Sequence, residues 1–195
     1  MRMQDVVGAV DRATAGKKVS VATGVGIHQS IVARHFRFDY PDRMLLTSCG
    51  HGTMGSGLPY LIGAWLERQD SIPILFTGDG SFLIESPGMA TLVEQGIPAK
   101  IFVLDNGSFG IVRQYEKLNG IRPIATRRPR IDWLSVAEAY GIPSVEFEEN
   151  GDWERQVARM CVLKGPWLMQ IPVSDIGVWP ILESGHWPEM TDGAD

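Results

Sequence analysis

The chain has 195 residues, of which 44% are hydrophobic and 21% charged, and its formal net charge is −5. These values are typical of one globular domain, and the negative charge disfavours a nucleic-acid-binding protein, for which a basic surface is expected. The two cysteines, Cys49 and Cys161, are too few for a disulfide framework and indicate a reducing compartment. Because no apolar run reaches the roughly 18 residues of a membrane span, and the N-terminus lacks a signal-like apolar segment, we expect a cytoplasmic protein that does not contact membranes.

Short apolar runs alternate with helix-like segments along the whole chain. We predict helices over 4–14, 28–36, 58–68, 82–95, 109–118, 133–140 and 153–163, and strands over 18–23, 44–47, 71–77, 100–104, 144–147 and 167–171. Repeated alternation of this kind indicates an α/β fold, with a doubly wound, mostly parallel sheet and helices on both faces. We expect residues 1–174 to form this domain and residues 175–195, rich in Trp, Pro and Gly, to form a tail that covers a partner interface.

Two polar motifs follow neighbouring predicted strands. Gly-Asp-Gly-Ser at 78–81 follows one strand, and Asn106 follows the next. Because parallel strands joined by a crossover helix end at the same edge of the sheet, Asp79 and Asn106 converge where open α/β sheets bind ligands. Such oxygen ligands suit Mg²⁺, which usually completes its octahedron with phosphate oxygens and water. The glycines on both sides of Asp79 allow the backbone to approach a diphosphate.

These residues resemble the signature of the thiamine diphosphate (ThDP) enzymes, in which Gly-Asp-Gly is followed by Asn after a similar spacer. Three further segments resemble the acetolactate synthase group: Gly-Val-Gly-Ile-His-Gln at 24–29, Gly-His-Gly-Thr-Met-Gly-Ser-Gly-Leu-Pro at 50–59, and Gly-Ser-Phe-Gly-Ile-Val-Arg-Gln-Tyr at 107–115. The resemblance runs from about residue 19 to 142. It implies the fold of the family's diphosphate-binding (PP) domain, with ThDP and Mg²⁺ as cofactors and a 2-oxo acid as substrate.

The resemblance also assigns roles to single residues. Asp79, Asn106 and the backbone carbonyl of Ser108 are the expected metal ligands. Met54 corresponds to the bulky apolar residue that holds ThDP bent, and we count Gly52 and Met54 as catalytic because their backbone meets the pyrimidine ring. The residues expected to contact the cofactor are Gly26, His28, Gly52, Met54, Gly78, Asp79, Gly80, Ser81, Asn106, Ser108, Gly110 and Ile111.

Several of these residues also have a plainer interpretation. Asp79 alone is a common helix N-cap, His28 alone a common surface residue, and Met54 alone ordinary core packing. The joint occurrence of the motifs favours the cofactor interpretation for all three. The arginines at 122, 127, 128 and 130 are interpreted as solvated rather than as a site for an anionic substrate group, and the role of His51 stays open.

Three positions depart from relatives of the family. Asp105 replaces the first Asn of an Asn-Asn pair, and we do not expect it to be a ligand. Tyr115 stands where acetolactate synthases have a Trp that shapes the acceptor pocket, which makes it a candidate substrate contact. Val112 stands where pyruvate decarboxylases have an acid that assists protonation, and this favours carboligation over aldehyde release.

The family's catalytic glutamate belongs to a pyrimidine-binding domain that this sequence does not resemble. Because the chain resembles only the diphosphate-binding domain, we expect the glutamate on a pyrimidine-binding (alpha) subunit in a hetero-oligomer, as in two-chain sulfopyruvate decarboxylase. The plainer alternative is a domain cut out of a longer protein, against which the initial Met argues weakly. The leading hypothesis is therefore the ThDP/Mg²⁺-binding subunit of a split, acetolactate synthase-like 2-oxo acid decarboxylase/carboligase. The alternatives are the beta subunit of a sulfopyruvate- or phosphonopyruvate-type decarboxylase, and a non-catalytic ThDP-binding scaffold subunit.

Overall fold

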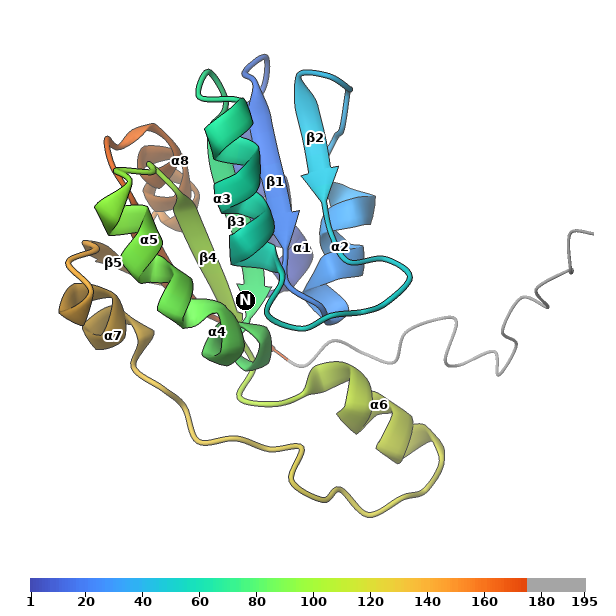
Figure 1. The fold of residues 1–195 in the computed structure, drawn as a ribbon. Helices are drawn as coiled ribbons and strands as arrows, with labels where there is room; N and C mark the ends of the chain where they lie inside the picture. Colours follow the sequence, from blue (N-terminus) through green and yellow to red (C-terminus); the bar gives the residue numbers. More distant parts are fainter. Residues whose placement is uncertain (175–195) are drawn as a thin grey trace, which may run out of the picture.

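A six-stranded sheet forms the centre of the molecule in the computed structural model, which describes residues 1–174 (Figure 1). Its strand order is β2-β1-β3-β4-β6-β5, and every neighbouring pair is parallel. The strands are β1 (Val19–Thr23), β2 (Arg43–Leu46), β3 (Ile72–Gly78), β4 (Lys100–Asp105), β5 (Ser144–Glu146) and β6 (Trp167–Pro172). The predicted doubly wound α/β fold is confirmed. The tail at 175–195, with its expected role at an interface, lies outside the described residues.

Helices cover both faces of the sheet (Figure 1). One face carries α1 (Met3–Ala13), α2 (Ile27–His35) and α8 (Trp153–Val162). The other carries α3 (Gly57–Glu67), α4 (Asp79–Glu85), α5 (Met89–Glu94) and α7 (Trp133–Ala139). Between these two layers the central strands are shielded from water on both sides.

Strand β4 shows why the central strands are continuous apolar runs. Phe102 and Leu104 pack in the cluster formed with α1, α2 and α8, whereas Ile101 and Val103 pack in the cluster formed with the opposite helices. All four side chains are fully buried, and each contributes about 1.5–3 kcal/mol relative to an exposed position. A parallel strand with two buried faces has no polar side, which is the pattern that predicted it.

The prediction of one continuous helix over 82–95 is wrong in both its start and its continuity. The observed helical segment begins at Asp79, and a short 3-10 turn at Ser86–Gly88 divides it into α4 and α5. Pro87 in this turn lacks an N–H and its ring disfavours an uninterrupted α-helix. The cap position before α4 is Gly78 rather than Asp79, so Asp79 is not the N-cap.

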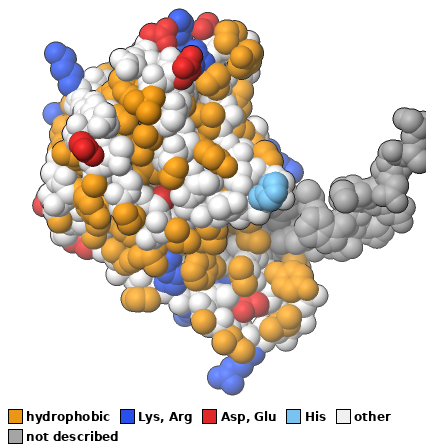
Figure 2. All heavy atoms as spheres, viewed as in Figure 1, with side chains coloured by type: hydrophobic (Ala, Val, Ile, Leu, Met, Phe, Trp, Pro, Cys, Tyr) orange, Lys and Arg blue, Asp and Glu red, His pale blue; other side chains and the backbone are white. Residues whose placement is uncertain are grey.

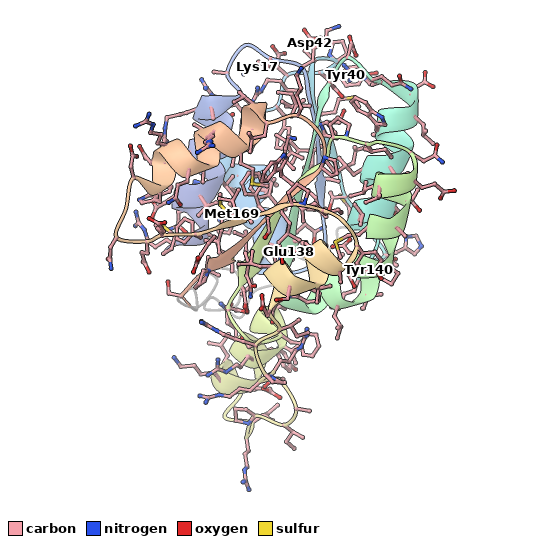
Figure 3. The ribbon with its side chains drawn as sticks, turned by 90° about the vertical axis from the view of Figure 1, so that its left-hand side faces the viewer. Lys17, Tyr40, Asp42, Glu138, Tyr140 and Met169 are labelled. Atoms are coloured by element: carbon pink, nitrogen blue, oxygen red, sulfur yellow. The ribbon has the colours of Figure 1, made fainter. Side chains whose placement is uncertain are left out.

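The carboxyl ends of the strands meet at one edge of the sheet, from which α6 (Gly110–Leu118) and the segment 119–131 project (Figure 1). Figure 3 shows Lys17, Tyr40 and Asp42 at the opposite end of the molecule. No helix in residues 1–174 is long and apolar enough to cross a membrane.

Candidate cofactor site

A cavity of about 210 Å³ lies at the carboxyl edge of β3 and β4. Its walls come from the loop after β1, the loop between β2 and α3, the beginning of α4, and the loop that leads from β4 into α6. All twelve residues that the sequence assigns to the cofactor line this cavity: Gly26, His28, Gly52, Met54, Gly78, Asp79, Gly80, Ser81, Asn106, Ser108, Gly110 and Ile111. The fold thus brings four separate motifs to one place.

Asp79 is the acidic side chain of the cavity wall, and it is only 5% exposed. Burial, followed by the negative charge of Asp105, raises the pKa of its carboxyl to about 6, while the charge of Arg128 acts in the opposite direction. A buried carboxylate of this kind is stabilised in its charged form by a nearby cation. The position is therefore electrostatically suited to a metal ion.

Asp105 is a second buried carboxylate, 1% exposed, behind the wall. Its Oδ1 accepts a hydrogen bond from the Gly107 N–H at 2.9 Å, and its Oδ2 accepts one from Gln170 Nε2 at 2.8 Å. Both oxygens therefore hold the loop after β4 in place. Its charge acts on Asp79 through space.

Asn106, on that same loop, lines the cavity together with Asp79. Its Oδ1 accepts a hydrogen bond from the Ser108 N–H at 3.2 Å, and a Cβ at Gly110 would lie 3.0 Å from its Nδ2. The glycine therefore leaves room for the amide. No group of three or more His, Cys, Asp or Glu in residues 1–174 could hold a metal, so an ion here depends on amide, main-chain and phosphate oxygens, as Mg²⁺ commonly does.

His28 sits in a cradle of glycines. A Cβ at Gly26 would lie 2.8 Å from its Cε1, and a Cβ at Gly78 would lie 3.0 Å from its Nδ1. These glycines therefore make room for the imidazole ring as well as for a ligand. Burial lowers the pKa of His28 to about 4, so the ring is neutral at pH 7. It can donate one hydrogen bond but adds no positive charge.

The loop that carries Gly52 and Met54 joins β2 to α3 and forms another wall of the cavity. Gly52 has a φ of +57°, a left-handed conformation that glycine adopts at little cost. A Cβ at Gly55 would lie 2.5 Å from Ile84 Cγ2, so this loop packs directly against α4. That contact fixes the position of Met54 relative to the start of α4.

Two side chains of α4 connect the loops around the cavity. The Ser81 hydroxyl donates to the Val25 carbonyl at 2.9 Å and accepts from the Val25 N–H at 3.2 Å. The carboxylate of Glu85 accepts from the Leu58 N–H at 2.8 Å and from the Thr77 hydroxyl at 2.5 Å, and burial raises the pKa of Glu85. Glu85 therefore ties the beginning of α3 to β3.

Sequence reasoning missed Glu85. The available signal was an acidic residue directly after the apolar residues 82–84, which indicates a buried carboxylate with hydrogen-bond partners elsewhere in the fold. It also missed five residues of the cavity wall: Met3, Val25, Ile27, Leu104 and Phe109. Val112, which the sequence singled out for its effect on the reaction, lines the wall as well. Tyr115 lies on α6 with 54% of its surface exposed and is not part of the wall. His51 and Cys49 are exposed on the loop before α3.

Unpaired polar atoms concentrate around this cavity. Five side-chain nitrogen or oxygen atoms in the described part of the chain are buried without a hydrogen-bond partner, and three of them are His28 Nε2, Ser108 Oγ and Arg128 Nη1. Buried polar groups are normally paired, so this concentration indicates that a polar ligand completes the site. Hydroxyl, imidazole and guanidinium groups all match phosphate oxygens, and the residues present therefore fit a diphosphate beside a metal.

Solved structures with the same fold include two decarboxylases. Benzoylformate decarboxylase from Polynucleobacter necessarius has a TM-score of 0.80 at 22% identity, covering 90% of this chain and 34% of that one. The ThDP-dependent 4-hydroxybenzoylformate decarboxylase of Rhodococcus jostii has a TM-score of 0.80 at 20% identity, covering 90% of this chain and 33% of that one. At these identities the likeness concerns the fold alone.

Curated relatives include acetolactate synthases. The mitochondrial enzyme of Schizosaccharomyces pombe is 33% identical over 189 residues, which are 95% of this chain and 28% of the relative. The large subunit of isozyme 2 from Escherichia coli is 33% identical over 170 residues, or 85% of this chain and 30% of the relative. The chain therefore spans less than a third of the length of these relatives.

The family comparison covers most of the chain and includes all of the predicted site. The model described as "Thiamine pyrophosphate enzyme, C-terminal TPP binding domain" matches residues 24–171, a range that includes every residue assigned to the cofactor. The chain therefore belongs to the thiamine pyrophosphate enzymes and contains their C-terminal TPP-binding domain.

Proposed function

We propose that this chain is the ThDP- and Mg²⁺-binding subunit of an acetolactate synthase-like 2-oxo acid decarboxylase/carboligase, and that a pyrimidine-binding partner chain completes its active site. The observation that carries the proposal is the convergence of Asp79, Asn106, His28 and Ser108 on one cavity, with buried polar atoms that lack partners. The 33% identity to acetolactate synthases over most of the chain supports the choice of reaction class.

Each residue of the wall has a defined task in this proposal. Asp79, Asn106 and the Ser108 carbonyl bind Mg²⁺, and neutral His28 donates a hydrogen bond to the diphosphate. Met54 supports the bent conformation of the cofactor from the loop before α3. When bound, ThDP supplies the carbanion chemistry that cleaves the bond next to the carbonyl of a 2-oxo acid.

The need for a partner is supported by what this chain's cavity offers. Its volume of about 210 Å³ is below the roughly 300–1,000 Å³ of typical small-molecule sites. Among the described residues that line it there is no glutamate, so the acid that the family uses at the pyrimidine has to come from elsewhere. The proposed source is the pyrimidine-binding chain.

Helix α6 offers a surface for that chain. Ile111, Val112, Tyr115 and Leu118 recur on α6, and each is between 39% and 54% exposed. Figure 2 shows hydrophobic side chains gathered over this projecting part of the molecule. Exposed apolar patches of this type mark protein interfaces, and this one is next to the opening of the cofactor cavity because Ile111 and Val112 also line it.

The test is a calorimetric titration of ThDP with Mg²⁺ into the full chain and into Asp79→Asn. We expect the substitution to abolish binding, because it removes the negative ligand without changing the size of the side chain. Glu138→Gln is the matched control, since Glu138 is exposed on α7 (Figure 3) and is not among the residues that line the cavity. Equal affinity of wild type and Asp79→Asn would contradict the proposed site.

A second candidate is a decarboxylase that acts on a 2-oxo acid with an additional anionic group. It is favoured by the exposed arginines at 122 and 127, which lie on the segment after α6; the residue at 127 forms a bridge to Ser108 of the site loop. Product analysis of the complex distinguishes the two candidates. A 2-hydroxyketone supports carboligation, whereas an aldehyde as the sole organic product supports the decarboxylase.

A further inference from the structure

The backbone that carries Arg128 is fixed beside the site loop. The Arg128 N–H donates to the Gly107 carbonyl at 2.9 Å, and the Phe109 N–H donates to the Thr126 carbonyl at 2.9 Å. Between these bonds, residue 127 forms an antiparallel bridge with Ser108. The segment that precedes α7 is thus aligned with the loop that provides Asn106 and Ser108.

Glu116 of α6 fixes the same segment from its other side. Glu116 is 8% exposed; its Oε2 accepts from the Thr126 hydroxyl at 2.9 Å and its Oε1 accepts from the Ile124 N–H at 3.3 Å. Hydrogen bonds to a charged acceptor are stronger than neutral ones. Arg128 therefore extends from a segment that is anchored at several points rather than from a loose loop.

The side chain of Arg128 lies against the cavity wall. Its guanidinium carbon is 5.2 Å from the centre of the Phe109 ring, and its Nη1 would be 3.2 Å from a Cβ at Gly80. Phe109 and Gly80 both line the cavity. The missing side chain of Gly80 therefore makes room for the aromatic ring and the guanidinium.

Arg128 differs from the three neighbouring arginines. Those at 122, 127 and 130 are exposed, as the solvated interpretation requires, whereas Arg128 is partly buried and its Nη1 is shielded from water without a hydrogen-bond partner. The solvated interpretation is therefore wrong for Arg128. A buried, unpaired donor on a charged group is costly, which points to a partner that binds there.

The charges around the cavity indicate what that partner is. The described residues that line the cavity include no Lys or Arg, and His28 is neutral at pH 7 because burial lowers its pKa to about 4. Asp79 and Asp105 supply the negative charges that a bound Mg²⁺ would balance, whereas a terminal phosphate would bring about −1.5 to −2 more. Arg128 is the cation whose charge acts on Asp79, so it is placed to compensate that phosphate.

We propose that Arg128 binds the diphosphate of ThDP, with Nη1 donating to an oxygen of the terminal phosphate beside Gly80. The planar guanidinium, whose carbon lies 5.2 Å from the centre of the Phe109 ring, is suited to phosphate oxygens in a way that a flexible ammonium is not. The metal then remains with Asp79 and Asn106. This inference rests on the proposed ThDP-binding function and adds to it a direct cationic contact.

The test is calorimetry on the full chain in the presence of Mg²⁺, with ThDP, inorganic diphosphate and thiamine as separate ligands. Arg128→Gln should weaken binding of ThDP and of inorganic diphosphate about 10- to 100-fold, the range expected for one charge-assisted hydrogen bond. Binding of thiamine, which has no phosphate, should not change. Arg130→Gln is the matched control, because Arg130 is exposed two residues away, and it should leave all three affinities unchanged.

Arg128→Lys distinguishes the loss of a diphosphate contact from a folding defect in Arg128→Gln. It keeps the charge and an apolar stem against Phe109, so its ligand-free unfolding temperature should match that of the wild type, while its affinity for diphosphate should fall between those of the wild type and Arg128→Gln. The titration series is repeated with the pyrimidine-binding chain present.

Two results would overturn the inference. If Arg128→Gln binds ThDP and inorganic diphosphate as tightly as Arg130→Gln does, Arg128 does not contact the diphosphate. In that case, tight binding of ThDP by the wild type would still support the proposed function. If ThDP affinity is unchanged but KM for the 2-oxo acid rises, Arg128 binds substrate instead. Failure of the wild type to bind either phosphate ligand would remove the proposed function itself.

Discussion

The two sides of the cofactor cavity differ in how they are built. The side formed at the ends of β1, β3 and β4 is buried, rich in glycine and held by side-chain hydrogen bonds such as those of Ser81 and Glu85. The side formed by α6 projects from the sheet edge and exposes Tyr115 and Leu118 (Figure 1). The first side is stabilised within the chain, whereas the second has an apolar surface that residues 1–174 leave uncovered. Substitutions on the first side should change ligand affinity or stability, whereas a substitution on the second should change association with a partner.

The largest effect concerns pH and the buried side. Because the pKa of Asp79 is raised to about 6, and metal ligands bind in their deprotonated form, Mg²⁺-dependent affinity for ThDP should be nearly constant above about pH 7 and fall as the pH drops through about 6. Below that pKa the loss is about tenfold per pH unit. Calorimetry between pH 5 and 8 measures it, and an affinity that does not change from pH 7 to 5 would contradict the role of Asp79.

The same carboxyl makes the opposite contribution to the stability of the ligand-free chain. Its folded pKa is raised above the unfolded value, so the folded chain holds the proton more tightly, and the contribution of Asp79 to stability falls as pH rises from about 4 to about 6. Asp79→Asn should remove this component from the pH dependence of unfolding.

The second prediction concerns two glycines of the same helix. A Cβ at Gly57 would lie 2.7 Å from the Gly24 backbone nitrogen, whereas a Cβ at Gly63 would meet nothing within 4 Å. Gly57→Ala should therefore destabilise the chain by about 1–3 kcal/mol through overpacking. Gly63→Ala should stabilise it by about 0.5–1 kcal/mol through helix propensity. Chemical denaturation measures both, and equal effects would mean that the contact between α3 and the loop after β1 is not tight.

The third prediction concerns Glu85. Glu85→Ala leaves the Leu58 N–H and the Thr77 hydroxyl without their buried acceptor and should cost about 1–3 kcal/mol. Glu94→Ala, an exposed glutamate on the next helix, should change stability by less than about 0.5 kcal/mol. A loss of similar size in both variants would show that Glu85 does not connect α3 to β3.

The smallest effect on the chain itself is expected at α6. Leu118→Ser should change unfolding free energy by less than about 0.5 kcal/mol, because the side chain is exposed. It should weaken association with the pyrimidine-binding chain about tenfold, as truncation of one well-packed interface residue does. Val162→Ser on α8, which is 61% exposed, is the control. If both variants associate like the wild type, α6 is not the interface.

The sequence was sufficient for most of the fold because strand and helix periods are local properties. The exception is the predicted helix 82–95, which a 3-10 turn containing Pro87 and Gly88 interrupts. Motif spacing also identified residues that share one cavity. The sequence could not predict the roles of Glu85 and Arg128, because each depends on partners far away in the sequence. Only the fold shows that Gly80 makes room for Arg128.

The most direct test of the account is the affinity of the full chain for ThDP with Mg²⁺, measured by calorimetry without and then with the pyrimidine-binding chain. We expect ThDP to bind to the chain alone through its diphosphate, and to bind much more tightly once the partner covers α6 and completes the cavity. Absence of binding under both conditions would contradict the cofactor site. Affinity that does not change with the partner would contradict a site shared between two chains.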